Sequence, residues 1–80
     1  MRHPNRLQIL IRLRNLELFL CTARRTKTEC VQRLQYTGAR MFLRDLRDLA
    51  ALGSEIVRQG APGKTTSYYC PRARAIFRHE

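Results

Sequence analysis

The sequence predicts a mainly helical α+β domain in which three helices precede a β-hairpin and a short C-terminal tail. Apolar residues recur at helical spacing through residues 6–52, a Gly-Ala-Pro-Gly turn follows, and a segment rich in Thr and Tyr comes after that turn. The chain has 80 residues, the size of one domain, so residues 1–80 are expected to share one core.

The first helix is predicted over residues 6–22, where Leu is abundant and Gly, Pro and Asp are absent. Its apolar residues lie on two faces. One face carries Ile9, Leu13, Leu16 and Leu20, and the opposite face carries Leu7, Ile11 and Leu18. A small domain buries only one such face, so the second face needs a cover. Either a homodimer contact or packing of the C-terminal tail, residues 72–80, would supply it.

The second helix is predicted over residues 28–35, after a basic connector that contributes a short strand. Thr28 is expected to begin this helix, with Glu29 in the first turn, where the helix dipole favours a negative charge. The expected inward residues are Cys30, Val31 and Leu34. A tight turn follows, in which Gly38 permits a positive φ and Thr37 caps the next helix.

The third helix is predicted over residues 38–52. Its core-facing residues are expected to be Phe42, Leu46 and Leu49, with Leu43 and Leu52 beside them. A different face carries Arg40, Arg44 and Arg47. Asp45 and Asp48 are three residues apart among these arginines, which suits ion pairing better than acid–base catalysis. Gly53 is typical of the position just after a helix end.

A β-hairpin is predicted over residues 54–71, with Ile56 and Val57 in its first strand and turn residues at its tip. The tail, residues 72–80, is expected to be a short docking helix or a basic arm. The stretch GAPGKT superficially suggests a phosphate loop. Only two residues separate its first glycine from Gly-Lys, and β-favouring residues follow, so no nucleotide cofactor is expected.

A short helix, a tight turn, a longer helix and a hairpin in this order are typical of a winged helix-turn-helix, which holds one helix in the major groove of DNA. The expected recognition residues are Thr37, Gly38, Ala39, Arg40, Met41, Arg44 and Arg47. Arg40 is the best candidate for a guanine contact, because arginine binds guanine O6 and N7 together. Contacts from the hairpin and to the DNA backbone are expected from Arg24, Arg25, Lys27, Thr28, Arg58, Lys64, Thr65 and Thr66.

The run TGARMFLRDLRDLAALG resembles the recognition helix of DeoR-type and related winged-helix transcription regulators. The end of the family pattern, Arg-Asp-Leu-x-x-Leu-x-x-Leu-Gly, is matched by Arg44, Asp45, Leu46, Leu49, Leu52 and Gly53. The resemblance covers residues 26–71 and implies DNA binding without indicating an effector. Two features depart from the family: residues 30–45 are one residue longer, and Arg40 or Met41 replaces a frequent Thr or Ser.

The charge of the chain favours a nucleic-acid partner. Sixteen Lys and Arg residues against six Asp and Glu give a net charge of +10, and fourteen of the sixteen are arginines, whose planar fork pairs with phosphates and base edges. The cysteines Cys21, Cys30 and Cys70 form no CxxC pair, and His3 and His79 lie near the chain ends. Neither a metal site nor a catalytic base is therefore expected, and free thiols indicate a reducing cytoplasm.

Together these observations predict a non-enzymatic, sequence-specific binder of double-stranded DNA that acts as a homodimer, with Leu7, Ile11 and Leu18 at the dimer contact. The expected role is a cytoplasmic, nucleoid-associated repressor of the size used by phages, plasmids and bacteria, with no cofactor, effector or membrane partner. One alternative is a protein-interaction module that inhibits or assembles a nucleic-acid machine; another is a binder of structured RNA. On the DNA-binding hypothesis, Lys64→Ala should weaken binding to all sequences alike.

Overall fold

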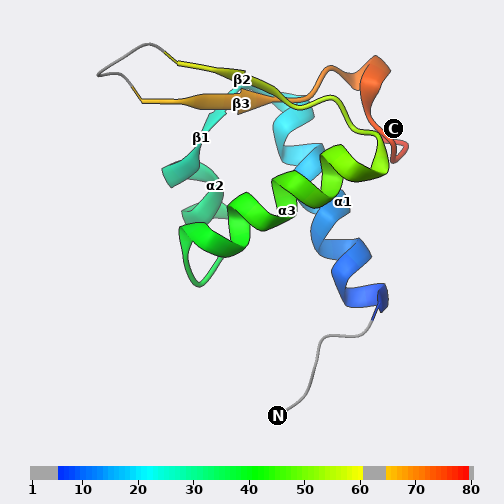
Figure 1. Ribbon diagram of the computed structural model, residues 1–80, viewed down its shortest axis with the longest axis horizontal. Helices are drawn as coiled ribbons and strands as arrows, with labels where there is room; N and C mark the ends of the chain where they lie inside the picture. Colours follow the sequence, from blue (N-terminus) through cyan, green and yellow to red (C-terminus); the bar gives the residue numbers. More distant parts are fainter. Residues whose placement is uncertain (1–5, 61–64, 80) are drawn as a thin grey trace.

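The computed structural model describes residues 6–60 and 65–79. This part of the chain contains three α-helices, three short strands and one 3₁₀ turn (Figure 1). Their bounds are Arg6–Thr22 for α1, Arg25–Thr26 for β1, Lys27–Arg33 for α2, Ala39–Leu52 for α3, Val57–Gln59 for β2, Ser67–Tyr69 for β3 and Arg72–Arg74 for the 3₁₀ turn η1. The predicted α+β class, three helices followed by a hairpin and a tail, is confirmed.

The strands form one antiparallel sheet in the order β1–β3–β2. Tyr68 in the central strand β3 lies opposite Arg25 of β1 on one side and Arg58 of β2 on the other. The short strand expected between the first two helices is therefore present. β2 begins three residues later than the predicted start at Ser54, because the Ser54 side chain is buried against α1 instead of extending the sheet.

The core lies where the three helices meet the sheet. Its buried apolar residues are Leu13, Leu16 and Leu20 of α1, Cys30 of α2, Phe42, Leu46 and Leu49 of α3, and Tyr36, Tyr68 and Cys70. The Phe42 ring packs edge-on against Tyr36 and Tyr68, with centroid distances of 6.0 and 5.4 Å. The expectation that Leu43 and Leu52 join this face is wrong, because they are 44% and 54% exposed. Each lies roughly 80–100° around the helix from the buried stripe.

The helix boundaries of α2 differ from the prediction because Thr26, and not Thr28, caps the helix. Thr26 Oγ1 accepts the Glu29 N–H at 3.2 Å, and Glu29 Oε1 accepts the Thr26 N–H at 3.1 Å. This reciprocal pair is a capping box, which satisfies two backbone donors at the helix start. It fixes the first helical residue as Lys27.

The turn between α2 and α3 also differs from the prediction, in its backbone conformation and in its cap. Gln35, with φ 58°, takes the left-handed conformation, whereas Gly38 is extended with φ −174°. Tyr36 N donates to Val31 O at 3.0 Å, the bond that closes a helix end when the preceding residue is left-handed. The positive φ therefore belongs to the end of α2. Gly38 is the N-cap of α3 and no side chain caps it, so the expected cap by Thr37 is wrong.

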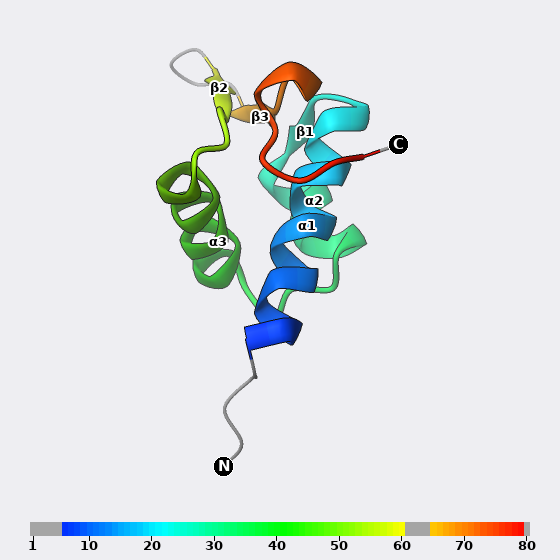
Figure 2. The same cartoon turned by 90° about the vertical axis from the view of Figure 1, so that its right-hand side faces the viewer.

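The C-terminal tail is held on α1 by one buried carboxylate, that of Glu17. Glu17 Oε1 accepts the Phe77 N–H at 3.0 Å and lies 2.7 Å from His79 Nε2. Glu17 Oε2 accepts the Ile76 N–H at 2.9 Å and also the Ser54 hydroxyl. Figure 2 shows the tail, in red, crossing α1. The tail is thus a short 3₁₀ turn followed by a docked segment.

Burial by itself raises the pKa of Glu17, but the hydrogen bonds from Ser54, Ile76, Phe77 and His79 outweigh it and hold this pKa below the ordinary value. The same contacts determine which part of α1 the tail covers. It packs beside Glu17 and leaves the first turns of α1 open, where Leu7 and Ile11 are 65% and 50% exposed. Packing of the tail therefore does not account for the second apolar face of α1.

Candidate nucleic-acid interface

The outer face of α3 carries three exposed arginines that have no partner within the described chain. Arg40, Arg44 and Arg47 are all exposed, at spacings of four and three residues. None of them has an ion pair or a hydrogen-bond partner among residues 6–60 and 65–79. The exposed side chain of Leu43 lies on the same face, three residues after Arg40 and four before Arg47.

Asp45 does not reduce the charge of this face, because its carboxylate is fully buried on the opposite side of α3. Its two oxygens accept from Arg12 Nε at 2.7 Å and Arg12 Nη2 at 3.1 Å, and Oδ2 also accepts the Tyr36 hydroxyl at 2.7 Å. The hydrogen bond to Asp45 raises the pKa of Arg12, and burial followed by the bond to Asp45 raises the pKa of Tyr36. This triad joins α3 to α1 and keeps the Asp45 carboxylate away from the outer arginines. Asp48, four residues after Arg44, is partly exposed but forms no ion pair with them in the described residues.

A hollow of about 320 Å³ lies at the start of α3. It is lined by Arg12, Thr37, Gly38, Arg40, Met41 and Arg44. Five of the seven recognition residues predicted from the sequence thus share one surface, and Ala39 and Arg47 lie outside its lining. A side chain on Gly38 would meet nothing within 4 Å, so its absence leaves free space at the helix start.

A second hollow, of about 270 Å³, lies between α2, α3 and the β2–β3 hairpin. It is lined by Lys27, Thr28, Leu43, Arg58, Thr65, Thr66 and Tyr68. Figure 1 shows the hairpin extending over the α2 side of the domain. Five residues predicted to contact the DNA backbone line this second hollow. Their ammonium, guanidinium and hydroxyl groups can donate hydrogen bonds to phosphate oxygens.

The remaining predicted backbone contacts lie elsewhere. The Arg25 guanidinium stacks 4.1 Å from the centre of the Phe19 ring and donates to Thr22 Oγ1 at 3.1 Å. Its Nη1 also lies 3.9 Å from the Glu29 carboxylate, so Arg25 is engaged within the domain. Arg24 is exposed and lies 5.2 Å from the centre of the Tyr69 ring. Lys64 lies outside the described residues.

The thiols are poorly suited to metal binding or nucleophilic chemistry. Burial raises the pKa of Cys30 to about 11 and that of Cys70 to about 12, so both thiols are protonated near neutral pH. Burial also raises the pKa of Cys21. Within the described part of the chain, no group of three His, Cys, Asp or Glu residues is placed to hold a metal ion.

Sequence reasoning missed Arg12 and Tyr36, which hold the Asp45 carboxylate inwards, and Glu17, which anchors the tail. A signal existed for Glu17, since it follows Leu13 by four residues and precedes Leu20 by three, which places it on the buried stripe of α1. No such signal existed for Arg12, because its partner Asp45 is 33 residues away in the sequence. Tyr36 follows the end of α2, where no helical or strand periodicity predicts that its ring is buried.

Comparisons of the chain with models of protein families, with curated proteins and with solved structures find no match. Among the helices described, none has the length and apolar character needed to cross a membrane. Function is therefore inferred from the charge, burial and contacts of the residues described above.

Proposed function

We propose that this protein is a winged helix-turn-helix module that binds double-stranded DNA in a sequence-dependent manner. In this proposal α3 is the recognition helix and the β2–β3 hairpin is the wing. The observation that carries it is the outer face of α3, where Arg40, Arg44 and Arg47 are exposed and unpaired while Asp45 is turned into the core. Such a face pairs favourably with phosphates and with guanine edges.

The order of the elements supports the proposal. A short helix, α2, and a longer helix, α3, are joined by a tight turn, and the sheet places the hairpin beside both of them. In helix-turn-helix proteins the second helix enters the major groove and presents the side chains of its first turns to the bases. Arg40 and Arg44 occupy those turns of α3.

The two hollows differ in their side chains, and this difference suits one of them to bases and the other to the sugar–phosphate backbone. The hollow at the start of α3 brings Arg40 and Arg44 together with Met41, a combination of base-reading donors and an apolar side chain. The hollow beneath the hairpin collects Lys27, Arg58 and two threonine hydroxyls, which suit the sugar–phosphate backbone. Backbone contacts of this kind position the protein and make its affinity depend on salt.

The proposed role is transcriptional repression by a homodimer in the cytoplasm. Repression requires only that the protein occupy DNA needed by another protein, so DNA binding by itself is sufficient. A homodimer would present two copies of α3 to a site with two-fold character. The exposed apolar residues of α1, Leu7 and Ile11, favour an association of this kind.

The test is selection of bound fragments from a pool of random duplex DNA at two salt concentrations, followed by titration of the selected site. Arg40→Ala should weaken binding to that site by about 1–3 kcal/mol and relax one base position. Arg74→Ala is the matched control, since it removes one exposed positive charge from the tail and should leave the base preference unchanged.

Three outcomes would count against the proposal. Binding that ignores sequence and disappears at the higher salt would reduce the interface to a general electrostatic attraction. A base preference unaltered by Arg40→Ala would show that α3 is not the reading helix. Stronger binding to structured RNA than to duplex DNA at equal salt would identify RNA as the ligand.

A further inference from the structure

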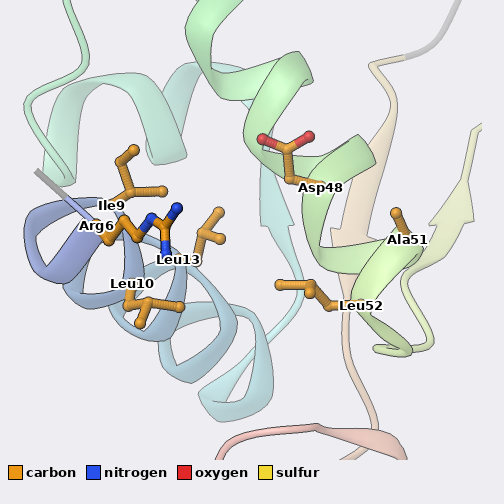
Figure 3. Close-up of a pocket in the computed structure, with 7 residues that line it drawn as sticks. All are labelled: Arg6, Ile9, Leu10, Leu13, Asp48, Ala51 and Leu52. Atoms are coloured by element: carbon orange, nitrogen blue, oxygen red, sulfur yellow. The ribbon is translucent and has the colours of Figure 1, made fainter. Parts of the chain in front are cut away.

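A groove of about 410 Å³ separates the first turns of α1 from the last turns of α3. Its floor and walls are mainly apolar, and the residues that matter here are Ile9, Leu10, Leu13 and Leu52, with Arg6 and Asp48 at the edges. Figure 3 shows the α1 residues facing Leu52 and Asp48 of α3 across the open space. The groove lies away from the start of α3, where the candidate nucleic-acid interface begins.

This groove is part of a larger apolar surface. Leu10 and Leu52 are 46% and 54% exposed at the groove. Leu7, one turn before Leu10, and Ile11 extend the exposed apolar surface around α1 but do not line the groove. The tail packs on α1 at Glu17 and does not reach the first turns of α1. Contiguous exposed leucine and isoleucine side chains on a soluble domain mark a place where another surface binds.

The charged residues at the edges of the groove indicate which surface binds there. Arg6 lies on the α1 side and Asp48 on the α3 side, and neither has an ion-pair partner among the residues described. If two copies packed on this groove around a two-fold axis, Arg6 of each copy would lie towards Asp48 of the other. The surface is thus complementary to itself in charge as well as apolar at its centre, as a two-fold contact requires.

We propose that the α1–α3 groove is the self-association surface of this protein, with Leu10 at its centre and reciprocal Arg6–Asp48 pairs at its edges. An acidic partner would favour the arginine-rich face of α3, whereas the groove carries one charge of each sign. The inference deepens the homodimer of the proposed function by naming its contact. It also places Leu18 outside that contact, because Leu18 lines a different hollow with Phe19 and Leu34.

The first test is self-association without DNA, measured by sedimentation equilibrium. Leu10→Ala should weaken the dimer by about a hundredfold, since the side chain is lost at two symmetry-related positions, each contributing about tenfold. Leu43→Ala is the matched control, because Leu43 is 44% exposed on the outer face of α3 and should leave the dimer unchanged. Circular dichroism verifies that both variants remain folded.

The second test reverses the charges. Arg6→Glu and Asp48→Arg should each weaken self-association by about tenfold, because two attractive pairs become repulsive in the homodimer. An equimolar mixture of the two variants should form a heterodimer of near wild-type affinity. In that heterodimer one edge pairs the two substituted side chains, a glutamate with an arginine, and the other edge keeps the original Arg6–Asp48 pair, so both edges are attractive.

A monomer at all concentrations, a dimer indifferent to Leu10→Ala, or a mixture that fails to form the heterodimer would each overturn this inference. A monomer that still selects a specific DNA sequence would overturn the groove contact and leave DNA binding intact. A dimer that binds no nucleic acid would retain the groove contact and reject the proposed function.

Discussion

Replacing Glu17 by glutamine keeps the size of a buried side chain while removing its charge and one of its two acceptor oxygens. The carboxylate accepts from Ser54 and Ile76 at one oxygen, and from Phe77 and His79 at the other. Whichever oxygen it replaces, the amide NH₂ group would face one backbone N–H as a second donor, so that hydrogen bond is lost. The other bonds lose the charge of their acceptor, which costs about as much again. Each hydrogen bond to a charged group contributes about 1.5–3 kcal/mol.

The expected loss of stability for Glu17→Gln is therefore about 3–6 kcal/mol. The whole free energy of unfolding for a domain of this length is about 4–12 kcal/mol, so the variant should be close to unfolding at neutral pH. The assay is urea denaturation followed by circular dichroism. Glu55→Gln is the matched control, because Glu55 is an exposed glutamate paired with Arg74 at 3.3 Å, and its loss should cost under about 1 kcal/mol.

Acid should reduce the difference between the wild-type protein and Glu17→Gln. The pKa of Glu17 is lower in the folded protein than its ordinary value of 4.5, so the carboxylate stabilises the fold above that value. This contribution is lost as the pH falls through the folded-state pKa, whereas glutamine does not titrate. A cost below about 1 kcal/mol at pH 7, or a difference independent of pH, would refute the assignment of Glu17 as the residue that anchors the tail.

Three further substitutions test the N-terminal cap of α2, the buried hydrogen bonds of Asp45 and the outer face of α3. Thr26→Ala should cost about 1 kcal/mol in urea denaturation, and Thr28→Ala much less, because only Thr26 caps α2; equal costs would contradict this. Tyr36→Phe should cost about 1.5–3 kcal/mol in the same assay, because it removes a buried hydrogen bond to the Asp45 carboxylate; an unchanged midpoint would argue against the triad. Leu43→Ala should abolish any preference of the selected DNA site for thymine over uracil in binding titrations, since in the proposed function the exposed Leu43 side chain, on the same face as Arg40 and Arg47, would contact a thymine methyl. A preference that persists in this variant would exclude Leu43.

Periodicity and turn chemistry were sufficient to predict the order and type of the elements. The leucine pattern of α1, the Phe42, Leu46 and Leu49 stripe of α3 and the glycine at position 53 are local signals, and each is confirmed. Local signals decide these features because the hydrogen bonds of a helix and of its C-terminal cap join residues only a few positions apart.

Features that depend on distant residues could not be predicted in this way. The burial of Asp45 depends on Arg12, and the path of the tail depends on Glu17, Ser54 and the backbone of residues 76 and 77. The sequence placed Asp45 among exposed arginines, which predicted a mixed charge on that face. Only the fold shows that its carboxylate is directed inwards. The DNA contacts predicted for the outer face of α3 and for the hairpin remain predictions.

Four of the five acidic residues of the described chain are held by contacts away from the outer face of α3. Glu17 and Asp45 are buried in hydrogen-bonded clusters, and Glu29 completes the cap of α2. Glu55 pairs with Arg74, and Asp48 lies at the α1–α3 groove. The excess of positive charge is therefore not spread evenly over the domain. Arg40, Arg44 and Arg47 have no ion pair in the described residues, so a polyanion at the outer face of α3 would displace no internal ion pair of these three arginines.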